Sequence, residues 1–150
     1  MLLERRDDGY ELSSEPERID LPLVHRWLST DAYWAMGRPI EEVRTAFAGS
    51  DAFGIYRDGG EQVAVARVIN DGAVFAYLCD VYVDRAHRGR GLGGWMARGL
   101  RDHYAELGLK RLLLTTRDAQ PVYAAQGFVE VDPGRWMACD LAAVRAAAKA

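Results

Sequence analysis

A glycine- and arginine-rich segment limits the possible folds of this chain more than any other part of its sequence. Residues 85–94 read RAHRGRGLGG and join an apolar stretch, residues 73–84, to a run in which Leu92, Met96 and Leu100 recur at helical spacing. Glycines let a ligand approach the backbone closely, and the first amides of a helix point toward negative charge. The sequence therefore predicts a strand, an anion-binding loop and a helix in that order, with a polyphosphate as the natural ligand of the loop.

Two other phosphate-binding motifs fit this segment poorly. Gly89, Gly91 and Gly94 match the GxGxxG pattern of dinucleotide-binding folds. In those folds the first glycine directly follows the strand, but here four residues separate Gly89 from the expected strand end at Asp84. Asp118 lies 29 positions beyond Gly89, whereas the acidic residue that holds a ribose is expected about 20 positions on. No Gly-Lys-Ser/Thr follows, which excludes a Walker P-loop. A purely structural alternative is a glycine-rich helix start packed tightly on the sheet.

The region before the loop has the pattern of an antiparallel sheet. Residues 52–57, 61–69 and 73–84 are rich in Val, Phe, Ile and Tyr. They are separated by Asp-Gly-Gly at 58–60 and Asn-Asp-Gly at 70–72, which are strong hairpin-turn signals. The sequence thus predicts a three-stranded antiparallel meander.

The region after the loop predicts a parallel crossover. Residues 112–116 form a short uncharged run, which is typical of a parallel strand covered on both faces. Together with the preceding helix and the last strand of the meander, this run forms a strand–helix–strand unit, right-handed by rule. A short helix is expected over residues 119–126. Residues 128–131 and 135–139, on either side of an Asp-Pro-Gly turn, predict a final hairpin.

The first third of the chain predicts two helices. Asp20 can cap the first, and Pro39 opens the second. The stretch between them, around Tyr33 and Trp34, predicts a further short helical turn. Residues 10–12 predict one short strand before the first helix.

Length and composition agree with a single α+β domain over residues 1–150. A chain of 150 residues can bury a core without disulfides or metals, and 49% hydrophobic and 27% charged residues are ordinary for a globular protein. The net charge of −3 argues against general binding to nucleic acids. Cys79 and Cys139 lie 60 positions apart, so neither a disulfide framework nor a metal site is indicated. No signal peptide or membrane span is recognised, and a cytoplasmic protein is expected.

Two motifs, in order and on the expected elements, resemble those of a known family. Residues 88–93, RGRGLG, are similar to the acetyl-CoA motif Q/R-x-x-G-x-G/A of the GNAT superfamily of N-acetyltransferases. Residues 123–128, YAAQGF, resemble its Y-x-x-x-G-F motif. The resemblance extends over residues 21–139. It implies a GNAT-like α+β fold: a mixed central sheet with an antiparallel N-terminal meander, a parallel βαβ unit and a C-terminal hairpin, with helices on both faces.

The resemblance implies acetyl-CoA as co-substrate and no metal. Backbone amides of residues 89–94 would cradle the pyrophosphate, with Arg88 near it. The strand at residues 81–83 would splay from its neighbour and pair through its backbone with the pantetheine arm. The amide near Val81 would face the thioester oxygen and stabilise the oxyanion. The residues assigned to acetyl-CoA in this way are Val81, Tyr82, Val83, Arg88, Gly89, Arg90, Gly91, Leu92, Gly93 and Gly94.

Two residues are candidates for catalytic proton transfer. The resemblance makes Tyr123 the acid that donates a proton to the departing thiolate, although a tyrosine there could also simply pack on the sheet. Asp80 interrupts the apolar strand FAYLCDVYV, and buried carboxylates are rare unless they are paired or functional. Asp80 is therefore either a base, acting through water on the incoming ammonium, or the ion-pair partner of Arg67 or Arg117.

Aromatic residues predict the acceptor pocket. The residues Tyr33, Trp34, Tyr77 and Trp136 lie on segments that border the acceptor cleft in the GNAT fold, although each could also belong to the core. Arg38 could recognise a carboxylate or be an ordinary surface arginine. Cys79 is better explained as a small buried side chain than as a nucleophile, because no histidine is an obvious partner for it.

The function that the resemblance implies is transfer of the acetyl group of acetyl-CoA to a primary amine, by direct attack in a ternary complex. The acceptor would be a small-molecule or protein amine, and the acidic net charge mildly suits a cationic one. Neither nucleic acid nor membrane is expected as a partner, and dimers are common in such families. The alternatives are a non-catalytic acyl-CoA-binding or sensor domain on the same fold and an NAD-type oxidoreductase.

Overall fold

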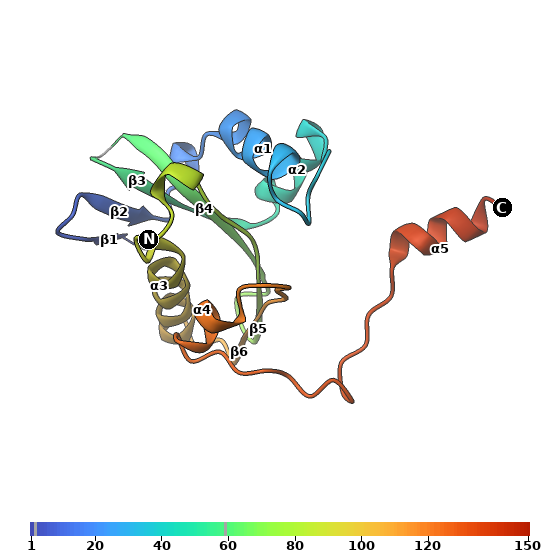
Figure 1. The fold of residues 1–150 in the computed structure, drawn as a ribbon. Helices are drawn as coiled ribbons and strands as arrows, with labels where there is room; N and C mark the ends of the chain where they lie inside the picture. Colours follow the sequence, from blue (N-terminus) through green and yellow to red (C-terminus); the bar gives the residue numbers. More distant parts are fainter. Residues whose placement is uncertain (2, 59) are drawn as a thin grey trace.

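A mixed sheet of six strands organises the residues that the computed structural model describes, namely 1, 3–58 and 60–150 (Figure 1). The first five strands pair antiparallel in sequence order, and the sixth adds in parallel to the fifth. The strands are β1 (Leu3–Arg5), β2 (Tyr10–Ser13), β3 (Asp51–Arg57), β4 (Glu61–Asn70), β5 (Phe75–Val83) and β6 (Arg111–Leu113). The helices are α1 (Leu21–Thr30), α2 (Ile40–Ala48), α3 (Leu92–Glu106), α4 (Gln120–Ala124) and α5 (Leu141–Ala148), with short 3₁₀ helices at Pro16–Arg18 and Arg85–His87.

The predicted meander is confirmed as β3, β4 and β5. Its second turn is built by Asp71, whose Oδ1 accepts hydrogen bonds from the amides of Val74 (2.8 Å) and Phe75 (3.0 Å). Gly59, in the first predicted turn, lies outside the described residues. The strand expected around residues 10–12 is β2, and it pairs with β1, a three-residue strand that the sequence pattern did not indicate.

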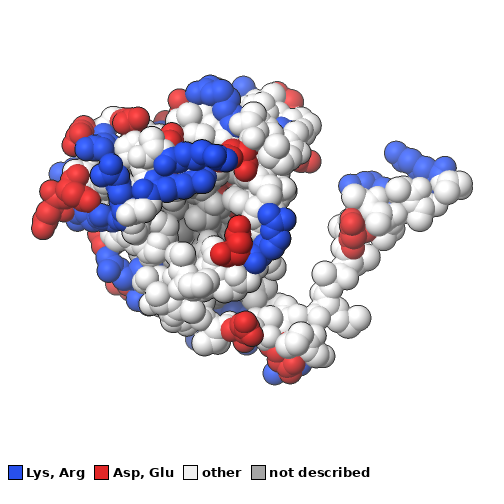
Figure 2. All heavy atoms as spheres, viewed as in Figure 1, with Lys and Arg blue, Asp and Glu red and all other residues white. Residues whose placement is uncertain are grey.

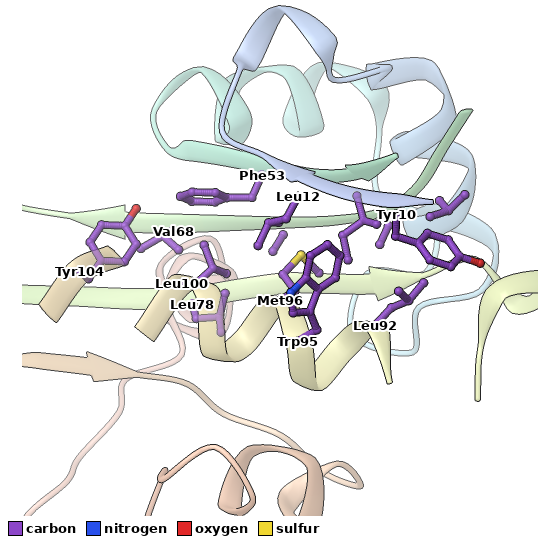
Figure 3. Close-up of a cluster of buried hydrophobic side chains, with 14 of the residues drawn as sticks. Tyr10, Leu12, Phe53, Val68, Leu78, Leu92, Trp95, Met96, Leu100 and Tyr104 are labelled. Carbon is purple, nitrogen blue, oxygen red and sulfur yellow. The ribbon is translucent and has the colours of Figure 1, made fainter. Parts of the chain in front are cut away.

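Helices cover both faces of the sheet, as expected. On one face α3 buries Leu92, Met96 and Leu100 against the strands, and Figure 3 shows these side chains pointing toward the sheet. On the other face α1 and α2 bury Val24 and Val43. The two layers hold β5 between them, and the loop before α3 starts at the end of this strand.

The predicted parallel unit is confirmed as β5, α3 and β6, with a shorter last strand than expected. β6 pairs only with residues 75–77 of β5, in the register Phe75 with Arg111 and Tyr77 with Leu113. From residue 78 onward, β5 therefore has no neighbouring strand on that side among the described residues. This leaves an opening beside the second half of β5.

The predicted C-terminal hairpin is wrong. No strand follows β6 in the described part of the chain, and Figure 1 shows residues after α4 running away from the sheet to an isolated α5. The Asp-Pro-Gly turn itself forms, since Gly134 N donates to Asp132 Oδ1 at 2.9 Å. The flanking segments do not pair, and Met137 is 97% exposed. A turn needs only local contacts, whereas a hairpin also needs an apolar face to cover.

The predicted helical stretch around Tyr33 and Trp34 is also wrong. Residues 31–37 form turns, in which Ala35 N donates to Ala32 O at 3.0 Å. Gly37 then adopts a left-handed conformation with φ +74°, which ends any helical path. The two aromatic residues consequently lie on a loop between α1 and α2, where both are exposed.

Candidate active site

A β-bulge in β5 shapes the centre of the site. Val65 of β4 pairs with Tyr82 and Arg67 pairs with Cys79, so Asp80 and Val81 have no register partners between them. Asp80 has a positive φ of 52°, an uncommon conformation for a residue other than glycine. Bulges re-aim side chains, and this one turns the carboxylate of Asp80 toward the loop between α1 and α2.

A groove of about 1070 Å³ runs along the second half of β5 and the start of α3. Every residue assigned to acetyl-CoA from the sequence lines it except Arg90, whose carbonyl oxygen instead accepts from Arg6 Nη1 at 3.0 Å. Arginines from the N-terminal strand region and from α3, Arg5, Arg6 and Arg98, also line it, and the sequence reasoning missed them. Figure 2 shows basic side chains gathered along the border of the hollow on this face.

The glycine loop leaves the floor of this groove open. Gly89 and Gly91 have left-handed φ values of +77° and +73°, which favour glycine. A Cβ atom added at Gly89, Gly91 or Gly93 would meet no other atom within 4 Å, so it would enter the open space of the groove. The first amides of α3 have no carbonyl partner within the helix and suit an anion. The predicted anion-binding loop thus has both the space and the donors.

A smaller pocket of about 630 Å³ lies on the other side of the bulge. Of the four aromatic residues predicted to border the acceptor cleft, Tyr33, Trp34 and Tyr77 line this pocket and Trp136 does not. Val81, Ala119 and Tyr123 line both this pocket and the groove. The two spaces therefore adjoin at Val81, Ala119 and Tyr123.

Tyr123 is partly buried at this junction. It lies on α4 and packs against the core under α3, with the Phe128 ring edge-on at 5.7 Å. Burial raises the pKa of Tyr123 to about 12, and Tyr33 and Asp118 add to the effect. The phenol is therefore protonated at neutral pH, as a proton donor must be.

Asp80 is buried and accepts three side-chain hydrogen bonds. Its Oδ1 accepts from Trp34 Nε1 at 2.8 Å, and its Oδ2 accepts from Arg38 Nη1 at 2.9 Å and from Arg67 Nε at 2.6 Å. Burial alone would raise its pKa, but the bonds and charges of Arg67, Trp34 and Arg38 outweigh this and lower it. Of the ion pairs expected from the sequence, the one with Arg67 forms. Arg117 instead stacks over Tyr33.

Residues 21–128 match the sequence model of the Acetyltransferase (GNAT) family. This chain belongs to the GNAT family. It is 30% identical over 133 residues to a candidate acetyltransferase of Gibberella zeae, and the match covers 76% of this chain and 75% of that protein. A solved candidate GNAT acetyltransferase from Xanthomonas campestris pv. campestris is 40% identical, with a TM-score of 0.80, and the match covers 87% of this chain and 92% of that one.

A second solved structure extends the likeness in fold alone. It is a predicted acetyltransferase from Clostridium acetobutylicum determined with acetyl-CoA, and it is 17% identical with a TM-score of 0.67. The match covers 90% of this chain and 97% of that one. The mixed sheet with helices on both faces is thus the GNAT fold.

Asp31 contacts two residues that line the groove, Tyr82 and Arg88, and the sequence reasoning missed it. Its carboxylate accepts from Arg85 Nε at 2.9 Å, from Tyr82 Oη at 2.6 Å and from Arg88 Nη2 at 3.2 Å. Hydrogen bonds from Arg85 and Tyr82 hold its pKa well below the usual range. Arg88 also donates through Nε to Val83 O at 2.9 Å, so it joins the loop to β5. An aspartate directly after a helix C-terminus opposes the helix dipole, which is the signal that could have found it.

Other chemistries would need a reactive thiol or a metal ion. Burial raises the pKa of the Cys79 thiol to about 11, so it is not a thiolate at neutral pH. Within the described residues, no group of three His, Cys, Asp or Glu side chains could hold a metal ion. No helix in the described part of this GNAT chain is long and apolar enough to cross a bilayer.

Proposed function

We propose that this GNAT protein transfers the acetyl group of acetyl-CoA to a primary amine. The observation that carries the proposal is the meeting of groove and pocket at Val81 and Tyr123. A thioester placed at this junction from the groove would be open to an amine that enters from the pocket. An amide and a phenol would lie on either side of the reacting carbon.

The groove fits the parts of acetyl-CoA. The glycine loop and the first amides of α3 suit the pyrophosphate. Arg5 and Arg98 also line the groove, and each forms an ion pair with a glutamate. The backbone of residues 81–83 has no neighbouring strand on the side of β6, so this edge suits the amides of the pantetheine arm. Arg88 supports the loop from the side, because its guanidinium binds Asp31 and Val83 O.

The reaction is direct attack within a ternary complex. The amine nitrogen attacks the thioester carbon, and the oxygen takes up negative charge beside the amide of Val81. The carbon–sulfur bond then breaks and the thiolate of coenzyme A takes the proton of Tyr123. The attacking nitrogen loses one proton to water, and a proton from water restores the phenol of Tyr123. An acyl-enzyme on Cys79 is disfavoured, because its raised pKa keeps the thiol protonated.

Asp80 has two proposed roles. As a base it would take the amine proton through water. Its lowered pKa weakens it for this task, since a general base works best with a pKa near the working pH. As an ion-pair partner it holds Arg38, Arg67 and Trp34 in place at the back of the acceptor pocket. The geometry favours the second role.

Thiol release from acetyl-CoA in the presence of a panel of amines tests the function. We expect amine-dependent release by the wild-type protein. Tight binding of acetyl-CoA without release for any amine would instead support the alternative, a non-catalytic acyl-CoA-binding or sensor domain. Binding of NADH in preference to acetyl-CoA would support the oxidoreductase.

We further propose a cytoplasmic homodimer that acts on a small-molecule or protein amine. Cys79 and Cys139 are both free thiols, which suits a reducing compartment. Self-association is supported by the exposed apolar side chains Val129, Met137 and Leu141 in the C-terminal arm, residues 128–150. Exposed apolar surface of this kind marks interaction sites.

A further inference from the structure

The acceptor pocket has a charge opposite to that of the whole chain. The chain is acidic, with a net charge of −3. The pocket is lined by the arginines Arg38, Arg67 and Arg117 and by the aspartates Asp80 and Asp118, so positive charges outnumber negative ones. Cationic acceptors are therefore less suited to this pocket than the overall charge suggests.

The back of the pocket holds part of this excess charge. A single oxygen of Asp80 accepts from both Arg38 and Arg67, at 2.9 and 2.6 Å, so one carboxylate serves two guanidinium groups. Glu42 lies 3.5 Å from Arg38 Nε, but its side chain is 65% exposed, so water screens its charge. A second anion in the pocket would balance the pair of arginines.

Arg117 is the arginine best placed to hold that anion. Its guanidinium carbon lies 3.8 Å from the centre of the Tyr33 ring, and its backbone amide donates to Tyr33 Oη at 3.2 Å. Among the described residues, no carboxylate forms an ion pair with it. A guanidinium stacked on a ring keeps the N–H groups at its edge free, in the fork that binds a carboxylate with two hydrogen bonds.

We propose that the acceptor is a small primary amine that also bears a carboxylate, and that Arg117 binds this carboxylate. The inference rests on the acetyl transfer proposed above. The pocket volume of about 630 Å³ suits a small molecule. The aromatic side chains Tyr33, Trp34 and Tyr77 pack against its apolar part, and its amine reaches the junction at Tyr123.

The first experiment compares acceptors that differ only in the carboxylate. Thiol release is measured for leucine, leucinamide and isopentylamine, and for phenylalanine, phenylalaninamide and phenethylamine, at saturating acetyl-CoA. We expect kcat/KM for each amino acid to exceed that for its amide by about 10- to 100-fold, as a charge-assisted hydrogen bond provides. The amide has the less basic amine and hence more free amine, so basicity alone predicts the reverse order.

The second experiment removes the guanidinium. Arg117→Gln should lower kcat/KM for the acids far more than for the amides and so bring the acid-to-amide ratio of kcat/KM to one or below. Arg117→Lys keeps the positive charge but loses the planar pair of N–H donors, so it should retain part of the preference for acids over amides. Arg111→Gln is the matched control, because Arg111 also stacks on a ring, that of Trp136 at 5.6 Å, but does not line the pocket. It should keep the wild-type ratio.

The outcomes separate this inference from the proposed transfer. Thiol release that is equal for acids and amides, or an acid preference that survives in Arg117→Gln, overturns the inference and leaves the transfer standing. If no amine supports release, the transfer fails, and calorimetry decides the inference separately. Leucine and phenylalanine must then bind the coenzyme A-saturated protein more tightly than their amides, in a manner that Arg117→Gln abolishes. Equal binding overturns it.

Discussion

Asp31 and Asp80 each hold two arginines, one pair on each side of the junction. Asp31 holds Arg85 and Arg88 beside the groove, and Asp80 holds Arg38 and Arg67 behind the smaller pocket, the proposed acceptor site. In these ion pairs the aspartate and the arginine lie 13 to 57 positions apart in the sequence, so no local sequence pattern predicts them. The sequence identified Asp80 as unusual because it interrupts an apolar strand. The sequence could not show whether Asp80 is a base or an ion-pair partner. The bulge that orients its carboxylate depends on the register between β4 and β5, which no local pattern encodes.

The change Asp80→Asn separates the two roles of this residue. We expect it to leave Arg38 and Arg67 without their buried counter-charge and to destabilise the fold by about 3–5 kcal/mol. Because the pKa of Asp80 is lowered in the folded protein, its carboxylate stabilises the fold above about pH 4 and loses this effect as the pH falls through the lowered value. Thermal melting should therefore show a lower Tm at neutral pH, and the difference from wild type should shrink in acid.

A pH–rate profile of the same variant completes the test. If Asp80 is the base, the variant keeps its Tm and loses rate chiefly at low pH, where the amine is protonated, and high pH partly restores the rate. A normal Tm with a wild-type pH profile would contradict both roles.

At the scale of elements, the loop from β5 to α3 was the most predictable part of the site. Its glycines, its helix start and its strand are encoded within about twenty consecutive residues, and the structure has them in that order. The opening beside β5 could not be predicted in the same way, because it depends on where β6 stops pairing. The same limit explains the wrong hairpin: its turn is local and forms, whereas pairing of its arms depends on a surface elsewhere in the fold.

Gly91→Val tests the loop as the cofactor site. A valine there would fill the open space of the groove and strain a left-handed residue, so we expect calorimetry to show no acetyl-CoA binding by the folded variant. Gly72→Val is a matched control, since Gly72 has a similar φ of +72° and no atom near its Cβ position but lies in the turn before β5. It should carry a similar strain, roughly 1–2 kcal/mol, and keep normal affinity. Normal affinity in Gly91→Val would make the loop structural.

For the whole molecule, the period of the apolar residues and the turn residues predicted the α+β class, the meander and the helix that covers it. These features depend on spacing within each element. β1 was not predicted, because a three-residue strand in a polar segment is too short to show an alternating apolar pattern. The C-terminal arm was expected to complete the sheet, yet its apolar residues Val129 and Met137 are exposed.

The exposed arm predicts self-association of the whole chain. Light scattering on the wild-type protein should give twice the mass of one chain at high concentration. Met137→Glu places a charge on the arm and should return the mass to that of a monomer. The same substitution at Met36, an exposed methionine in the loop between α1 and α2, should leave the mass unchanged. A monomer at all concentrations would rule out the homodimer.

Tyr123→Phe tests the central claim, that acetyl transfer takes place where the groove meets the pocket. The change removes one hydroxyl and keeps the ring in its packing against Phe128. General acid catalysis contributes about 10²- to 10⁴-fold, so kcat for thiol release should fall by that range. The Kd for acetyl-CoA, measured by calorimetry on the same preparation, should stay within about a factor of three, because the phenol acts only on the leaving thiolate. A kcat within about that same factor of wild type would contradict the account and assign Tyr123 to packing.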